Sequence, residues 1–164
     1  MTILIHGAAG GVGSFAAQIA KNSGARVIGT AASDDIEYLK SIGVDEVIDY
    51  KQERFEDKIT SPDAIVDLVG GETLARSYAA VKSGGVLATT VQPIDELAAK
   101  RAGIRAVHVV MHRNAADLAE LAKLVEQGAL KPRLAQTLSL TQAKQAQELS
   151  ESGRTHGKVI LKVA

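Results

Sequence analysis

The sequence is most informative at residues 2–13, where Thr2-Ile3-Leu4-Ile5-His6 runs directly into Gly7-Ala8-Ala9-Gly10-Gly11-Val12-Gly13. The first five residues are uncharged, mostly apolar and rich in β-branched side chains, which is typical of a buried strand. The glycine-rich run that follows predicts a tight turn. From Ser14 to Lys21 apolar side chains recur at helical spacing, and Gly24 is a stop signal. A strand, a glycine turn and a helix are therefore expected in direct succession.

The same alternation continues along the chain. Strands alternating with helices through short, Gly-containing links favour a parallel sheet covered on both faces. We predict an α/β protein with a Rossmann doubly wound parallel six-stranded sheet and helices on both faces. The further strands are expected at Arg26–Thr30, Glu46–Asp49, Asp63–Val69, Gly85–Thr90 and Ile104–Val110, and the further helices at Ser33–Ile42, Glu72–Val81, Asp95–Arg101 and Asn114–Gln127.

The pattern changes after Gly128. A strand over Leu134–Leu140, a helix over Thr141–Ser152 and a strand over Lys158–Val163 are expected there. We therefore predict two parts, a dinucleotide-binding domain at residues 1–128 and a C-terminal strand-helix-strand segment at residues 129–164.

Composition argues against several classes of function. The 164 residues carry 19 Lys and Arg against 19 Asp and Glu, so there is no electrostatic reason to expect a nucleic-acid partner. No apolar stretch reaches the length of a membrane span, so no membrane partner is expected. Cysteine is absent, in agreement with a reducing compartment, and we expect a cytoplasmic protein. The four histidines are scattered without ligand spacing, which predicts no metal site.

The glycine turn fits the phosphate-binding pattern G-x-G-x-x-G with Ala8 in the first place. Gly10 lets the backbone approach a pyrophosphate, Gly13 lets the helix pack closely on the strand, and the helix N-terminus offers free N–H groups to the anion. We predict cofactor contacts from Ala8, Gly10, Gly11, Val12 and Gly13. The alternative is a turn whose glycines serve only close packing.

The end of the second predicted strand bears on the choice of dinucleotide. Many NAD-binding units carry an acidic residue roughly 20 residues beyond the glycines, where it binds the ribose 2′-OH. This strand instead runs into Thr30-Ala31-Ala32-Ser33. Without a carboxylate there is no repulsion of a 2′-phosphate, and the Ser33 hydroxyl could donate to one. We predict cofactor contacts from Thr30 and Ser33 and favour NADP(H) over NAD(H).

Seven segments that extend over most of the chain carry a family resemblance. They are His6 to Gly13, Ala17 to Lys21, Gly24 to Thr30, Val47 to Tyr50, Asp67 to Leu74, Gly84 to Leu87 and Gly157 to Val163. Together they resemble the zinc-free, quinone-oxidoreductase-like branch of the medium-chain dehydrogenases/reductases. The resemblance implies metal-free hydride transfer between NADPH and a quinone, an enone or a related carbonyl compound. It also implies adenosine-phosphate contacts near Ser33 and Tyr50, and nicotinamide-side contacts from Val69, Gly70, Thr90, Val91 and Gln92.

The resemblance further implies parts that this chain does not contain. The family has a catalytic domain before the glycine motif, and its C-terminal residues, here 129–164, pack on that domain. The apolar edge strand Ile104–Val110 invites pairing, and the family forms dimers through this edge. We therefore expect a possible homodimer, a missing N-terminal catalytic domain, and cofactor binding that is more robust than turnover.

Residues 34–37 bear against the preference for NADP(H). Asp34 and Asp35 follow Ser33 directly, and Asp34 is spaced from Glu37 as in a capping box. We interpret the two aspartates as helix-capping residues. Where many NADP-using relatives have a lysine shortly after the serine, this chain has Ile36, so the cation that would pair a 2′-phosphate is missing.

Two alternatives stay open. Tyr78 and Lys82 match the Y-x-x-x-K pair of short-chain dehydrogenases, but they lie between the fourth and fifth predicted strands rather than after the fifth. We interpret them as ordinary helix residues and leave the catalytic residues unassigned. The second alternative is a dinucleotide-binding module without catalysis of its own, since the catalytic half is not in this chain.

Overall fold

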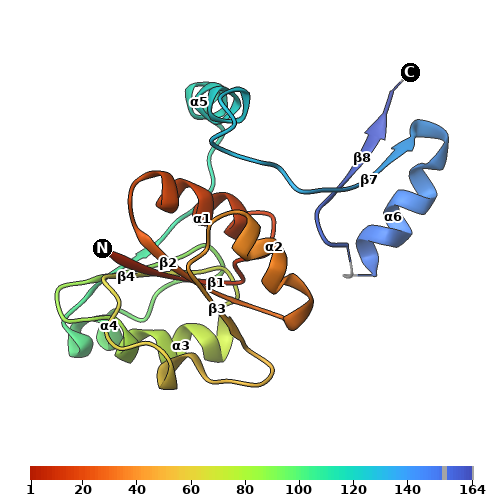
Figure 1. The fold of residues 1–164 in the computed structure, drawn as a ribbon. Helices are drawn as coiled ribbons and strands as arrows, with labels where there is room; N and C mark the ends of the chain where they lie inside the picture. Colours follow the sequence, from red (N-terminus) through yellow and green to blue (C-terminus); the bar gives the residue numbers. More distant parts are fainter. Residues whose placement is uncertain (153–154, 164) are drawn as a thin grey trace.

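The computed structural model describes residues 1–152 and 155–163, and its main feature is one parallel sheet of six strands (Figure 1). The strand order β3-β2-β1-β4-β5-β6 reverses direction beside β1, as in doubly wound dinucleotide-binding folds. The predicted fold class is confirmed. The strands are β1 (Thr2–His6), β2 (Arg26–Ala31), β3 (Glu46–Asp49), β4 (Ala64–Asp67), β5 (Val86–Thr89) and β6 (Arg105–His108).

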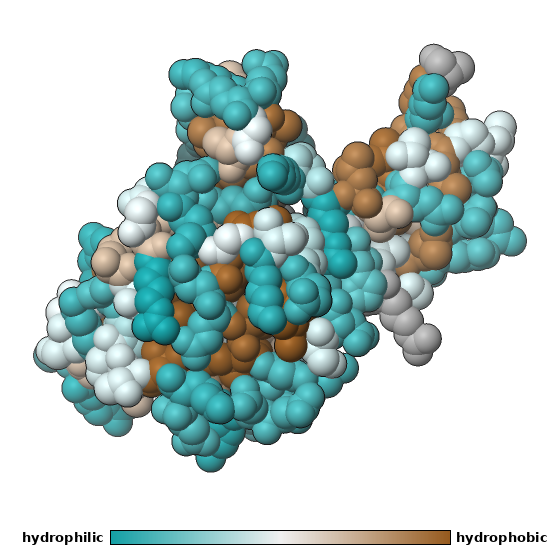
Figure 2. Space-filling view, viewed as in Figure 1, coloured by the Kyte–Doolittle hydropathy of each residue, from teal (hydrophilic) through white to brown (hydrophobic). Residues whose placement is uncertain are grey.

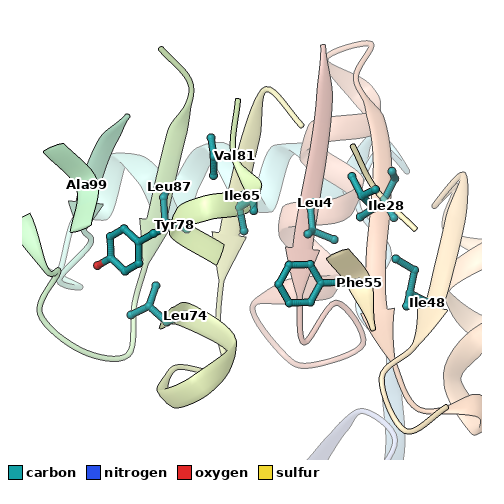
Figure 3. Close-up of a cluster of buried hydrophobic side chains, with 11 residues drawn as sticks. Leu4, Ile28, Ile48, Phe55, Ile65, Leu74, Tyr78, Val81, Leu87 and Ala99 are labelled. Atoms are coloured by element: carbon teal, nitrogen blue, oxygen red, sulfur yellow. The ribbon is translucent and has the colours of Figure 1, made fainter. Parts of the chain in front are cut away.

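Helices cover both faces of this sheet because side chains alternate along each strand. Leu4 of β1 belongs to a core layer shared with α3 (Gly71–Ala80) and α4 (Glu96–Ala102). Its neighbour Ile5 belongs to the opposite layer, shared with α1 (Gly13–Asn22) and α2 (Ile36–Ser41). Figure 3 shows the first layer, in which side chains from the strands gather with those of α3 and with Phe55.

The predicted helix over residues 33–42 differs in its first turn. A 3₁₀ turn, η1 (Ser33–Asp35), precedes α2, and neither element has a side-chain cap. The capping-box prediction was therefore wrong. The Asp35 carboxylate instead accepts hydrogen bonds from Arg133 and His156, which lie about a hundred residues further along the chain.

The C-terminal segment forms a separate two-stranded parallel sheet of β7 and β8. Its elements are η3 (Leu140–Gln142), α6 (Ala143–Glu151), β7 (Leu134–Ser139) and β8 (Lys158–Lys162), preceded by α5 (Ala115–Glu126). Residues 153, 154 and 164 of the predicted segment lie outside the described residues. No helix in the described part of the chain is long and apolar enough to cross a membrane.

Helix α5 has an apolar stripe that nothing in the described structure buries. Leu118 is 66% exposed, and Leu121 and Val125 are also exposed. Figure 2 shows apolar side chains on the surface of α5 and of the C-terminal segment. The two sheets are linked by polar contacts, since Gln18 of α1 bonds the backbone N–H and C=O of Lys131.

Candidate functional site

A pocket of about 550 Å³ opens where β1, β2, β3 and β4 end. The carboxyl ends of parallel strands beside a change of direction in strand order are where open α/β sheets bind ligands. Of the predicted contacts, the pocket contains Gly10, Thr30, Tyr50 and Val69. The complete lining is His6, Gly7, Ala9, Gly10, Thr30, Ala31, Ala32, Asp35, Ile48, Tyr50, Glu53, Arg54, Phe55, Leu68, Val69, Thr73 and Arg76.

The glycine turn has two kinds of glycine. A Cβ on Gly13 would lie 2.3 Å from the carbonyl oxygen of Gly7, so Gly13 is required for packing. Gly10 is exposed, and its added Cβ would meet only the Gly7 oxygen, at 3.2 Å. Among the described residues, no hydrogen bond takes up the N–H of Gly11 or Val12, which directly precede α1. The turn therefore presents open backbone donors at a helix N-terminus.

Ala8 and Ser33 take different positions around the turn. The Ala8 side chain is fully buried, and its N–H donates to the Thr30 carbonyl at 3.1 Å. Ser33 is exposed at the start of η1, outside the pocket lining, while Tyr50 is exposed at its rim after β3. Both hydroxyls are therefore open to solvent near the end of β2.

His6 is the most buried titratable group that lines the pocket. Ser77 Oγ donates to the Thr73 carbonyl at 2.7 Å, so it accepts from His6 Nε2 at 3.1 Å. His6 Nδ1 then accepts from the Thr30 hydroxyl at 3.3 Å, and the same oxygen accepts the N–H of Gly7 at 3.2 Å. Burial lowers the pKa of His6 to about 4, so the ring is neutral near pH 7 and holds the start of the glycine turn.

The buried carboxylate of Asp67 shapes the turn after β4. It accepts the N–H of Gly70 at 3.1 Å and the hydroxyl of Thr89 at 2.9 Å. The Val69 N–H also points to it, at 3.4 Å. These bonds hold the turn that carries two predicted contacts, Val69 and Gly70.

The loops after β4 and β5 touch at this turn. Gly70 has φ +78°, and an added Cβ would lie 2.8 Å from Val91 Cγ1. Gln92 Oε1 accepts the N–H of Gly71 at 3.0 Å, and the N–H of Thr90 donates to the Asp67 carbonyl. The structure thus brings Val69, Gly70, Thr90, Val91 and Gln92 together, beside the larger pocket.

The C-terminal segment brings cations to the glycine turn. A smaller pocket of about 90 Å³ contains Gly10, Gly11, Arg133 and Lys158. A Cβ added to Gly11 would lie 2.6 Å from Lys158 Nζ, so this ammonium group stands beside the open backbone of the turn. A cation and free N–H groups at one place provide a site for an anion.

Tyr78 and Lys82, the alternative catalytic pair, both make structural contacts. Tyr78 is buried, and its hydroxyl accepts the N–H of Asp95 at 2.7 Å. Lys82 pairs with Asp63 at the opposite end of β4 from the pocket. The two side chains therefore serve packing and pairing at these positions.

A profile of the family described as zinc-binding dehydrogenase matches residues 42–161. The chain belongs to this family. As the sequence motifs indicated, the chain is a quinone-oxidoreductase-like member of the medium-chain dehydrogenase/reductase superfamily. Among residues 1–152 and 155–163, no group of three or more His, Cys, Asp or Glu side chains could hold a metal ion.

Several similar proteins are named as oxidoreductases or reductases. The chain is 31% identical to the human NAD(P)H oxidoreductase RTN4IP1, mitochondrial, and 35% identical to the tomato 2-methylene-furan-3-one reductase; 98% of the chain is covered in each case. These matches cover 48% and 40% of the two relatives, so the chain spans about half the length of the curated relatives it matches, or less.

Solved structures agree with this assignment. A quinone oxidoreductase from Coxiella burnetii superposes with a TM-score of 0.88 at 35% identity, covering 99% of this chain and 53% of the other. Mycobacterial Rv1454c, solved in complex with NADPH, superposes with a TM-score of 0.83 at 27% identity, covering 99% and 56%.

Sequence reasoning missed the charged residues of the site. Asp35 was interpreted as a cap, and Arg133, His156 and Lys158 were not connected with the glycine turn. Local patterns give no signal for them, because β7 and β8 reach the turn only through tertiary packing. The one available hint was the short motif that begins at Gly157, where a Cβ would lie 2.7 Å from the Arg133 carbonyl oxygen.

Proposed function

We propose that this chain is the dinucleotide-binding part of an oxidoreductase that transfers hydride between NADPH and a quinone, an enone or a related carbonyl compound. The observation that carries the proposal is the pocket of about 550 Å³ beside the glycine turn, at the carboxyl ends of four parallel strands. Relatives named as NAD(P)H oxidoreductase and quinone oxidoreductase support the reaction class.

The turn fits a pyrophosphate. Gly10 has no side chain between the backbone and a ligand, and the N–H groups of Gly11 and Val12 are open at the start of α1. The partial positive charge of the helix N-terminus and the ammonium of Lys158 add attraction for the anion. These are the groups that we propose as pyrophosphate ligands.

The adenosine end fits NADP(H) better than NAD(H). The last residue of β2 is Ala31, so the strand end itself carries no carboxylate, and the carboxylate of Asp35 on the pocket rim is already paired with Arg133 and His156. Thr30 lines the pocket, and Ser33 and Tyr50 are exposed residues near the strand end. We propose these three residues as contacts of the adenosine ribose and its 2′-phosphate.

A bound nicotinamide would supply the hydride, and this chain's own residues would position it. Asp67 fixes the backbone of Val69 and Gly70, and Gln92 fixes the start of α3. We propose that the turn formed by Val69 and Gly70, together with the start of α3, contacts one face of the nicotinamide ring and orients it. The substrate pocket and the exclusion of water would be completed by a catalytic domain outside this chain, because the relatives are about twice as long.

Three further elements belong to the proposal. Residues 1–128 would be the dinucleotide-binding domain, and residues 129–164 the segment that packs on the catalytic domain, where the exposed side chains of Leu134, Leu140 and Ile160 offer apolar surface. The exposed edge strand β6 would pair two copies. We keep a cytoplasmic location as a prediction, although the human relative is named as mitochondrial.

The second candidate is a dinucleotide-binding module that does not catalyse a reaction. The pocket at the glycine turn and the open backbone donors beside it would serve binding alone. Oxidation of NADPH with a quinone or enone acceptor separates the two: a binding module binds NADPH but shows no acceptor-dependent turnover.

The first test is a titration of the chain with NADPH and, separately, NADH, followed by nicotinamide fluorescence. Gly10→Asp places a carboxylate and side-chain bulk against the pyrophosphate, so binding of both dinucleotides should be lost. Ser33→Glu should weaken NADPH selectively, because it repels a 2′-phosphate. Equal binding by wild type and Gly10→Asp would show that the turn is not the site.

A further inference from the structure

The Asp35 carboxylate, on the rim of the large pocket, has two long-range partners. Arg133 Nη1 donates to it at 2.6 Å and His156 Nδ1 lies 2.8 Å away. Burial acts to raise the pKa of Asp35, but these two hydrogen bonds and the charges of Arg133 and His156 together outweigh it and hold the pKa below its ordinary value. Asp35 is therefore ionised and already paired in the folded chain.

Arg133 is held in place from several sides. Its guanidinium lies 4.0 Å above the centre of the Tyr38 ring, and its carbonyl accepts the N–H of Lys158 at 2.8 Å. Two residues earlier, Gln18 of α1 bonds both backbone groups of Lys131. The charge of Arg133 is thus positioned by the backbone, by an aromatic face and by Asp35.

Within residues 1–152 and 155–163, most of the hydrogen-bonding capacity of Arg133 is unused. A guanidinium carries five N–H donors, and among the described residues the only hydrogen-bond acceptor of the Arg133 side chain is Asp35. The side chain also lines the smaller pocket, which shares Ala9 and Gly10 with the large one. A planar cation, several of whose donors are taken up by no described residue, therefore lies near both Asp35 and the glycine turn.

We propose that Arg133, oriented by Asp35, is the residue that recognises the 2′-phosphate of NADP(H) in this chain. Many NADP-using relatives have a lysine where this chain has Ile36, and Arg133 would supply the missing cation. The inference rests on the proposed function, since it assumes a dinucleotide at the glycine turn. A 2′-phosphate carries about two negative charges and binds the fork of a guanidinium in bidentate fashion, whereas the 2′-OH of NAD(H) gives Arg133 no anion to bind.

Asp35 affects phosphate binding in two opposing ways. It orients Arg133, but its own negative charge repels the phosphate. Asp35→Asn keeps an acceptor oxygen for Arg133 and removes the charge, so affinity for the 2′-phosphate should rise. If Asp35 instead bound the ribose 2′-OH directly, as acidic residues do in NAD-specific units, the same variant would lose affinity for ligands without the phosphate.

The test is calorimetric titration of the chain with adenosine 2′,5′-bisphosphate and with ADP. Both contain adenosine, a 5′-phosphate and one further phosphate, which is on the 2′ oxygen in the bisphosphate and at the 5′ end in ADP. Arg133→Gln should weaken the bisphosphate about 10- to 100-fold, the range expected for one charge-assisted contact, and change ADP less than about 2-fold. Arg133→Lys should restore part of the loss. Lys131→Gln, an exposed neighbour with the same change of charge, is the control and should alter neither ligand.

Several outcomes overturn the inference. Equal weakening of both ligands by Arg133→Gln, or no effect on either, would show that Arg133 does not discriminate, while binding of NADPH by the wild type would leave the proposed function intact. Loss of ADP affinity in Asp35→Asn would assign Asp35 to the ribose hydroxyl. Failure of wild type to bind NADPH, NADH and both adenosine ligands would overturn the proposed function and this inference together. Circular dichroism of each variant checks that it folds.

Discussion

Single residues in the glycine turn serve packing or binding, and the two roles can be separated experimentally. Gly13→Ala would force a Cβ to within 2.3 Å of the Gly7 oxygen and 2.8 Å of Ala8 Cα, both backbone atoms that cannot rotate away. We expect a loss of roughly 1–3 kcal/mol in the free energy of unfolding, measured by urea denaturation.

Gly10→Ala is the matched variant for this experiment. Its Cβ meets only one backbone oxygen, at 3.2 Å, and points to an exposed position. We expect stability close to wild type and weaker NADPH binding. If Gly10→Ala unfolds as easily as Gly13→Ala, both glycines serve packing, and the alternative of a purely structural turn gains support.

His6 should make the stability of the chain depend on pH. Burial lowers its pKa to about 4, against 6.5 for an ordinary histidine, so between these values the unfolded chain binds more protons. Its contribution is fully present above pH 6.5 and falls as the pH drops toward 4, by about 3 kcal/mol at most. Urea denaturation at a series of pH values measures this fall.

Two histidine variants control the measurement. His6→Gln should remove the part of the pH dependence that lies between 4 and 6.5. His112→Gln, which alters an exposed histidine, should retain it. A wild-type chain with constant stability across this interval would contradict the assignment of a neutral, buried His6.

At the scale of elements, strongly patterned segments could be predicted and short polar ones could not. The run from β1 into α1 forms as expected, because its apolar pattern and its glycines favour the same structure. Residues 33–35 instead form a 3₁₀ turn, in which Asp35 bonds the distant Arg133 and His156 rather than the end of its own helix. Local spacing alone could not reveal such partners.

Helices α3 and α5 both contain leucines but differ in their burial. Leu74 of α3 is 2% exposed in the core layer of Figure 3, whereas Leu118 of α5 is 66% exposed. Leu74→Ala should lower the free energy of unfolding by about 2–5 kcal/mol, and Leu118→Ala by less than about 0.5 kcal/mol. Thermal and urea unfolding of the two variants measure the difference. A large effect of Leu118→Ala would mean that α5 packs against another surface in solution.

At the scale of the whole molecule, β6 leaves one edge of the sheet unpaired. Val107 and Val109 are partly exposed beside it, and an open apolar edge favours pairing with a second copy. We expect the chain to sediment as a dimer and Val109→Lys to shift it to monomer. Leu97→Lys, on an exposed face of α4, is the control and should leave the dimer intact. A monomeric wild type would contradict the proposed pairing.

The sequence by itself determined the parallel six-stranded sheet, the position of the glycine turn and the family, because these depend on the periodicity of apolar residues and on glycines next to one another in the chain. Only the tertiary structure decided which charges surround the turn. Arg133 and His156 reach Asp35, and Lys158 reaches Gly11, because the residues that lead into β7 are hydrogen-bonded to α1 and β8 pairs with β7. Ion pairs between residues about a hundred positions apart leave no local pattern, since they arise from the packing of one element on another.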